Sequence, residues 1–152
     1  MSVSTTTNYI VNLFAADELV NTIALSASGI IDTKKESIYP LVTIEYNGFE
    51  IDRDNALLKD DYTITILQQR DSRKAEQPSK LMEDTNYIDN LNECQSICVN
   101  FVNYIDRFEL ENINIDSLSI SEPLSNYGGA NLDGFRIDIT FSVPNTGFCT
   151  TT

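Results

Sequence analysis

Two cysteines on one predicted helix are the first residues whose type and spacing could do chemistry. Cys94 and Cys98 are four positions apart, so both side chains leave a helix on the same side, as a metal half-site requires. A structural zinc site needs two further thiolate or imidazole ligands. The chain has no histidine, and its only other cysteine is Cys149. We therefore interpret Cys94 and Cys98 as small buried apolar residues, and the sequence predicts no metal.

An acidic stretch at residues 50–61 is the second candidate. Its segment 52–55, Asp-Arg-Asp-Asn, resembles the start of a calcium loop. An EF-hand also needs a central glycine, a terminal glutamate and flanking helices, whereas here a predicted strand precedes and the glycine is missing. We interpret the stretch as a turn-like, solvated acidic loop. Its acidic residues are Glu50, Asp52, Asp54, Asp60 and Asp61.

A basic loop at residues 68–80 reverses the sign of the charge locally. It holds four cations against Asp71 and Glu76, in a chain with 10 basic residues, 23 acidic residues and a net charge of −13. Two interpretations stay open: a solvated loop, or a contact arm that docks on the acidic stretch of an identical neighbour. The cations of this loop are Arg70, Arg73, Lys74 and Lys80.

No arrangement of a nucleophile and a base points to catalysis. Without histidine the commonest general base is missing, and no serine, lysine or aspartate lies in a recognised catalytic context. The glycine-rich run at 128–130 precedes a strand, whereas a phosphate-binding loop opens a helix. The strong negative charge argues against a nucleic-acid-reading module. We therefore expect a protein that is not an enzyme and binds no cofactor.

The totals indicate one globular domain. The chain has 152 residues, 41% of them hydrophobic, which is enough to bury a core. No apolar run approaches the roughly 20 residues that span a bilayer, and the N-terminal residues lack the features of a signal peptide. We expect a single domain over residues 1–152, with loose tails at 1–7 and 146–152, that is made in a reducing cytoplasm and contacts no membrane.

Apolar residues spaced three and four apart predict two amphipathic helices. Asn8 would cap a first helix that begins at Tyr9 and has roughly three turns. A second, longer helix would start after a cap at Asp84 or Thr85 and run to about residue 106. Its apolar stripe consists of Tyr87, Leu91, Cys94, Cys98, Phe101 and Ile105.

Strict alternation of apolar and polar residues predicts a strand from Phe135 to Val143, which Pro144 ends. Further strands are predicted at 39–48, closed by an Asn-Gly turn signal, at 62–68, at 113–120 and, less sharply, within 22–31. The result is an α+β fold, with two helices on one face of a mostly antiparallel sheet of four to five strands. The opposite face would be polar, and either exposed to solvent or in contact with another copy.

This order of elements resembles the tail-terminator and head-to-tail connector (neck ring) proteins of tailed bacteriophages. The resemblance covers about residues 8–145 and is closest to phages that infect Bacteroidetes, including the crAss-like group. The resemblance lies in the order of the elements and in the residue pattern of the strands. The strand that begins Gly134-Phe135-Arg136 is its most specific part. The other segments that carry it are 39–44, 62–67, 84–106 and 129–145.

The resemblance implies a structural virion protein. Six or twelve copies would form a ring that joins the portal to the tail beside neighbouring neck or tail rings, with DNA passing through its lumen. An acidic surface fits a lumen that must not hold a passing duplex. The basic loop and the acidic stretch would then be contacts between subunits or rings. The alternatives are an acidic cytoplasmic binding domain, such as an inhibitor that mimics DNA with two rows of carboxylates, and, last, an unrecognised enzyme.

Overall fold

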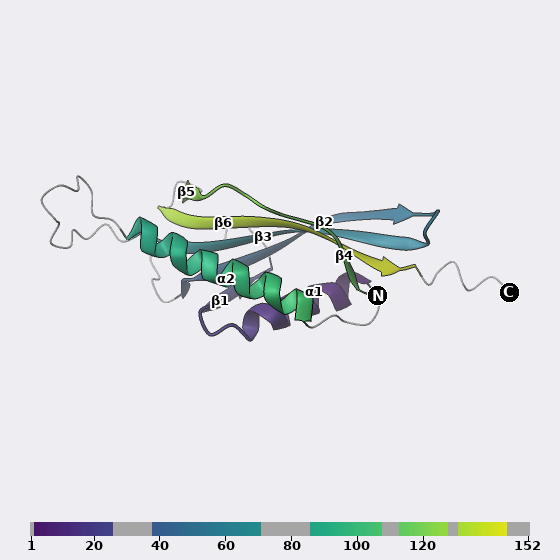
Figure 1. The fold of residues 1–152 in the computed structure, drawn as a ribbon, viewed down its shortest axis with the longest axis horizontal. Helices are drawn as coiled ribbons and strands as arrows, with labels where there is room; N and C mark the ends of the chain where they lie inside the picture. The colour runs from purple at the N-terminus through teal and green to yellow at the C-terminus, as the bar shows by residue number, and fades with distance from the viewer. Residues whose placement is uncertain (1, 26–37, 71–85, 108–112, 128–130, 146–152) are drawn as a thin grey trace, which may run out of the picture.

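The computed structural model describes residues 2–25, 38–70, 86–107, 113–127 and 131–145. Two helices and six strands follow one another in an α+β arrangement, which confirms the predicted fold class (Figure 1). Among the described residues, no helix is long and apolar enough to cross a membrane. The elements are α1 (Ser2–Ala15), β1 (Thr22–Ala24), β2 (Leu41–Asp52), β3 (Leu57–Gln69), α2 (Tyr87–Arg107), β4 (Asn114–Ile120), β5 (Leu124–Tyr127) and β6 (Leu132–Pro144).

The six strands form one sheet in the order β1-β2-β3-β6-β4, and β5 also pairs with β6. Within the described ranges, only the short pairing of β1 with β2 is parallel, and the other pairs are antiparallel. Strands β3 and β6 pair along their whole length. The sequence did not reveal β5, because its four residues are too few to show an alternation.

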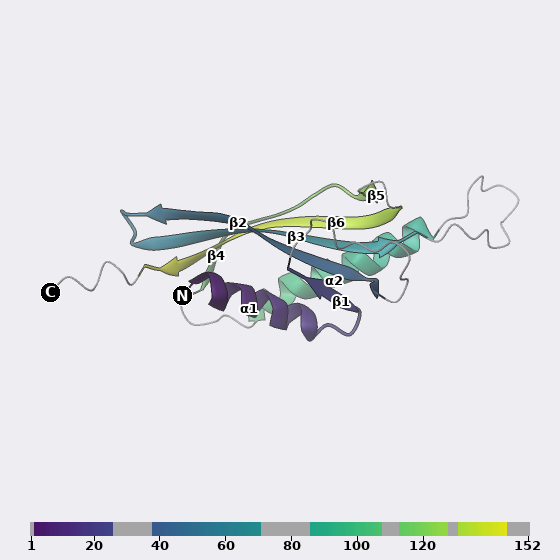
Figure 2. The same ribbon diagram turned by 180° about the vertical axis from the view of Figure 1, so that it is seen from behind.

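Both helices cover the same face of the sheet, as predicted (Figures 1 and 2). The rings of Phe14 in α1 and Phe101 in α2 stack with their centroids 4.6 Å apart. Apolar side chains of β2, β3 and β6 complete a single core beneath them. The strand members of this core are Val42, Ile44, Tyr62, Ile64, Ile66, Ile137, Ile139 and Phe141.

The opposite face is only partly the polar surface that was predicted. At one end of the sheet, Leu41, Leu67 and Leu132 are buried on this face together with Tyr39. Partly buried residues of β5 pack against them. The strand that the sequence did not reveal therefore covers a second, smaller apolar cluster.

The first helix begins earlier than predicted, at Ser2 instead of Tyr9, so residues 2–7 are helical and not a loose tail. Its first turns are held by tertiary contacts: Thr6 is fully buried, and the Thr7 hydroxyl lies 2.8 Å from the Tyr62 hydroxyl. Such contacts outweigh the modest helix propensity of a Ser/Thr-rich segment. The loose tail predicted at 146–152 and the caps predicted for α2 lie outside the described residues.

The first helix ends at Ala15, and Asp17 lies just beyond it in the connection to β1. An Asp17 carboxylate oxygen accepts a hydrogen bond from the backbone N–H of Leu19 at 2.9 Å. The other carboxylate oxygen accepts one from the Asn100 side chain at 3.2 Å. Asp17 thereby stabilises the turn after α1 and links it to α2.

The acidic stretch is a β-hairpin and not a turn-like loop. Only residues 53–56 form the turn, and the remainder belongs to β2 and β3. The Asn47-Gly48 pair, predicted as a turn, is a β-bulge inside β2, where the pairing shifts between Tyr46 and Gly48. Gly48 has a φ of 113°, a conformation that L side chains rarely adopt.

Gly134 belongs to β6 and not to the glycine-rich turn before it. A Cβ at this position would lie 1.7 Å from the carbonyl oxygen of Ile66 in β3. Only glycine therefore allows β3 and β6 to approach each other here.

Replacing Gly134 by alanine should destabilise the protein by about 3 kcal/mol or more, because backbone atoms must move apart to admit the methyl group. Gly48→Ala is the matched comparison: no atom lies within 4 Å of its Cβ, so only the backbone strain of about 1 kcal/mol is expected. Urea unfolding followed by circular dichroism measures both. Equal losses for the two variants would contradict the close approach at Gly134.

Candidate functional site

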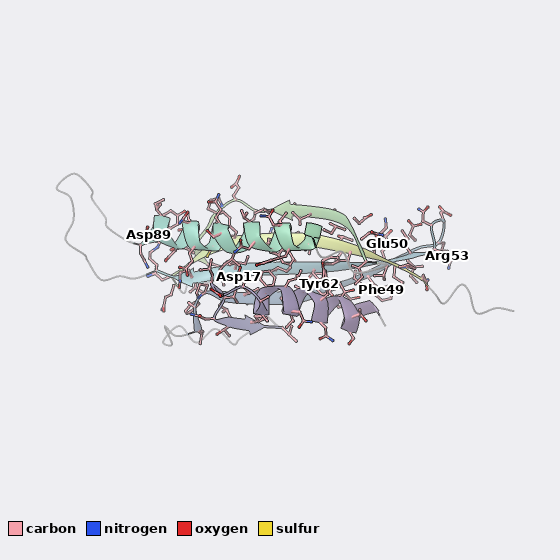
Figure 3. The ribbon with its side chains drawn as sticks, turned by 60° about the horizontal axis from the view of Figure 1, so that its bottom comes forward. Asp17, Phe49, Glu50, Arg53, Tyr62 and Asp89 are labelled. Atoms are coloured by element: carbon pink, nitrogen blue, oxygen red, sulfur yellow. The ribbon has the colours of Figure 1, made fainter. Side chains whose placement is uncertain are left out.

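The β2–β3 hairpin extends past the region that the helices cover (Figure 3). We call residues 45–61 the hairpin arm; Arg53 lies at its far end. The end of β6 lies beside β3 in this region, with Leu57 paired to Pro144, so the arm is part of a continuous sheet. This extension is a folded surface that the described part of the subunit leaves largely exposed.

The helix-side face of the arm is apolar. Phe49 is 62% exposed and Ile51 is 48% exposed. Phe49 pairs with Asp60 and Ile51 with Leu58, and these positions on β3 continue the row of Tyr62. Directly opposed residues of an antiparallel pair point to the same side, so the core face of the sheet continues into the arm as exposed apolar side chains.

The bulge at Gly48 determines this arrangement. Side chains alternate along a strand, so a one-residue change in register exchanges the faces. Without the bulge, Glu50 and Asp52 would point to the helix side and Phe49 to the other side. With it, the apolar residues from Val42 to Ile51 stay on the helix side.

Most of the predicted acidic residues lie at the surface of the arm. Glu50, Asp54 and Asp61 are exposed and Asp52 is half-buried. Hydrogen bonds from the Asn55 side chain and backbone N–H to Asp52 lower the pKa of that carboxyl group. Glu50, Asp52 and Asp61 lie on the face opposite the helices and Asp54 lies in the turn, so a partner could reach four of the five predicted acids.

Asp60 is the exception, because it is buried with 1% of its surface exposed. One of its oxygens accepts a hydrogen bond from the Tyr46 hydroxyl at 3.1 Å, and the other has no hydrogen-bond partner among the described residues. Burial, and then the bond to Asp60, raise the pKa of Tyr46 to about 12. Asp60 is therefore an internal residue of the arm and not an exposed contact.

Lys59 is a charged residue of the arm that the sequence did not single out. Its ammonium group lies 3.8 Å from an oxygen of Asp52 and 3.5 Å from an oxygen of Asp116 in β4. These ion pairs join β3 to both edges of the sheet. Ion pairs near the surface contribute little to stability, so these partly exposed pairs mainly reduce the negative charge of the local surface.

Arg70, the first cation of the basic loop, is engaged within the subunit. Its Nε and Nη2 donate to the two carboxylate oxygens of Asp133 at 3.0 and 2.6 Å, and Nη2 also donates to the Ser125 hydroxyl at 2.9 Å. The guanidinium lies 4.8 Å from the centre of the Tyr87 ring. The other three cations, Arg73, Lys74 and Lys80, lie outside the described residues.

Asp133 is the partner of Arg70, and the sequence did not predict this pair. It is fully buried, and its carboxylate also lies 3.4 Å from the Asn90 side chain, which donates to the Gln69 carbonyl at 3.1 Å. We call Arg70, Asp133 and Asn90 the polar clamp. The sequence alone could not identify Asp133 as the partner, because the chain has 23 acidic residues. Asp133 comes beside Arg70 only when β3 and β6 pair.

The outer face of the sheet carries a row of polar side chains. Asn47 donates to Thr63 at 2.6 Å, Thr63 donates to Asp138 at 3.1 Å, and Arg136 lies 3.4 Å from Asp138. A shallow hollow of about 290 Å³ lies over this row. Its carboxylates already accept hydrogen bonds from threonines, Thr63 on Asp138 and Thr140 on Asp61. The hollow is part of a polar surface.

Cys94 and Cys98 are both buried against the sheet, as predicted. Burial raises the pKa of each thiol to about 12. Within the described part of the chain, no three Cys, Asp or Glu residues come together in a way that could hold a metal ion. Cys149, the third cysteine, lies outside the described residues.

Comparisons with known proteins find similarity among solved structures only. No family model matches the chain, and no curated protein matches it. Among solved structures, the chain is similar to a chain of the virion of a native gene transfer agent particle, with 8% identity and a TM-score of 0.33. The match covers 88% of this chain and 89% of the other. A likeness this weak carries no argument on function, and the affinity with crAss-like phages stays a prediction.

Replacing Asp133 by alanine should cost about 3 kcal/mol of stability, because Arg70 would lose the bidentate partner of a largely desolvated pair. The control is Asp138→Ala, which removes an exposed ion pair with Arg136 and should cost about 0.5 kcal/mol or less. Thermal unfolding of both variants measures the difference. Equal melting temperatures would show that the polar clamp does not stabilise the fold.

The two buried thiols should resist alkylation in the folded protein. With a pKa of about 12, only about one thiol in ten thousand is ionised at pH 8, and the thiolate is the reactive form. Iodoacetamide followed by peptide mass mapping should leave Cys94 and Cys98 unmodified in native buffer and modify both in urea. Rapid native modification of either residue would contradict its burial against the sheet.

Proposed function

We propose that this protein is a structural component of a phage-like virion that works by packing against copies of itself and against neighbouring virion proteins. The observation that carries the proposal is the hairpin arm. It is a folded extension whose helix-side face exposes Phe49 and Ile51, although α1 and α2 cover the same face elsewhere. Apolar surface that a subunit leaves uncovered is typical of an interaction site.

In the finer form of the proposal, six or twelve copies make a ring in the neck or tail that joins the portal to the tail. The net charge of −13 supports a role beside DNA without binding it, because an acidic lumen repels phosphates and lets a duplex pass. The acidic residues at the surface of the arm would meet cations of the 68–80 loop of a neighbour. Glu50, Asp52, Asp54 and Asp61 are the candidates, with Arg73, Lys74 and Lys80 as their partners.

The distribution of charge does not favour the DNA-mimic alternative. A mimic needs two rows of unpaired carboxylates, whereas the described outer face joins Asp138 to Thr63 and Arg136, and Lys59 to two acids. The absence of a nucleophile-and-base pair in the sequence supports a non-enzymatic role in the same way.

The experiment that tests the proposal begins with purified particles of the virus or element that encodes the chain. Mass spectrometry should find the protein in particles at a constant ratio to the portal protein. Native mass spectrometry of the chain with portal should then give a complex with several copies. A duplex at low salt should not be retained by the protein. Repeated absence from particles, together with a monomer in every mixture, would refute the proposal.

A further inference from the structure

The sheet ends in two strands that have an unpaired side. On one edge, β1 pairs only with residues 41–43 of β2, so β2 from Ile44 to Asp52 has no neighbour on that side among the described residues. On the other edge, β4 pairs only with β6 within the same described set. Unpaired backbone N–H and C=O groups at such edges readily accept another strand.

The two edges lie at the same level of the sheet. Glu45 of β2 pairs with Thr63, which pairs with Asp138, which pairs with Ser119 of β4. A second row, closer to the hairpin turn, runs from Glu50 through Lys59 and Ser142 to Asn114. Residues 45–50 of β2 and 114–119 of β4 therefore span the same part of the sheet.

The directions of the strands also fit. From β2 through β3 and β6 to β4, each strand is antiparallel to the one before it, so β2 and β4 run in opposite directions. If a second copy is placed beside the first in the same orientation, its β2 is antiparallel to the β4 that it meets. An identical contact can then repeat from copy to copy, as a ring requires.

Exposed apolar side chains gather on these edges. Five of the ten exposed large hydrophobic residues in the described part of the chain lie on the two strands, namely Tyr46, Phe49, Ile51, Ile115 and Ile120. On β4, Ile115 pairs with Phe141 and Ile120 with Ile137, so both point to the helix side, as Phe49 and Ile51 do on β2. A bulge in each strand keeps them there.

We infer that copies of this chain join edge to edge, with the β2 edge of one copy paired antiparallel to the β4 edge of the next. The contact continues the sheet across the boundary and buries the exposed apolar residues of both edges as one layer. This inference deepens the proposed ring and rests on it, since it names the surfaces through which the copies meet.

The test uses three full-length variants that each place one lysine on an exposed apolar position. Phe49→Lys blocks the β2 edge and Ile120→Lys blocks the β4 edge, because a buried lysine opposes pairing. Ile88→Lys is the control, since Ile88 is 69% exposed on α2, away from both edges. Circular dichroism and melting temperatures establish that all three fold. Native mass spectrometry and sedimentation then measure assembly against the 17.1 kDa subunit.

We expect the wild-type chain and Ile88→Lys to assemble alike, and each edge variant to associate about tenfold more weakly or not at all. An equimolar mixture of the two edge variants should form a one-to-one pair, because each supplies the edge that the other lacks. A monomeric wild type, or a mixture that forms no such pair, would overturn the inference. So would assembly blocked by Phe49→Lys alone, which would indicate pairing of β2 with β2.

The outcomes separate this inference from the proposed function. Rings that assemble normally with both lysines in place would overturn the edge-to-edge contact and leave the virion role standing. Absence of the protein from purified particles would overturn the role, whatever the purified variants do.

Discussion

The constraint on which the structure depends is that one face of a long sheet must stay apolar past the point where the helices end. Strands β3 and β6 pair along their whole length, and most of their core residues face α1 and α2. The helices cover only part of this length (Figure 3). The remainder keeps the same alternation, so apolar side chains such as Phe49 are carried out to the surface of the hairpin arm.

The two irregular strands follow from the same constraint. Strand β2 has a bulge at Gly48 and β4 has one between Ile115 and Ser117. Each bulge resets the alternation so that apolar residues stay on the helix side instead of changing to the polar outer face. The arrangement is consistent with a subunit whose apolar layer is completed by another copy, while the outer face and the net charge of −13 keep it soluble.

The parts of the fold that could be predicted are those with a regular spacing of apolar residues along the sequence. Alternation located β3 and β6, and the three-and-four spacing located α2 and its buried cysteines. The turn predicted at the Asn47-Gly48 pair was wrong, because the same residue types occur in hairpin turns and in bulges. Only the pairing of the strand distinguishes a bulge from a turn. Arg70 was correctly noticed as a local cation, but its partner Asp133 comes from a strand more than sixty residues away. The contacts of the remaining basic residues stay predictions.

The polar clamp has a consequence for how this protein can vary. Residues on both sides of the 71–85 segment are anchored to the body: the Arg70 N–H donates to the Asn131 carbonyl at 2.9 Å, and Asn90 holds the Gln69 carbonyl. The clamp therefore holds the end of β3, the first turn of α2 and the start of β6 together. A substitution in any one of these three segments should change the effect of a substitution in the other two, because the three side chains share partners.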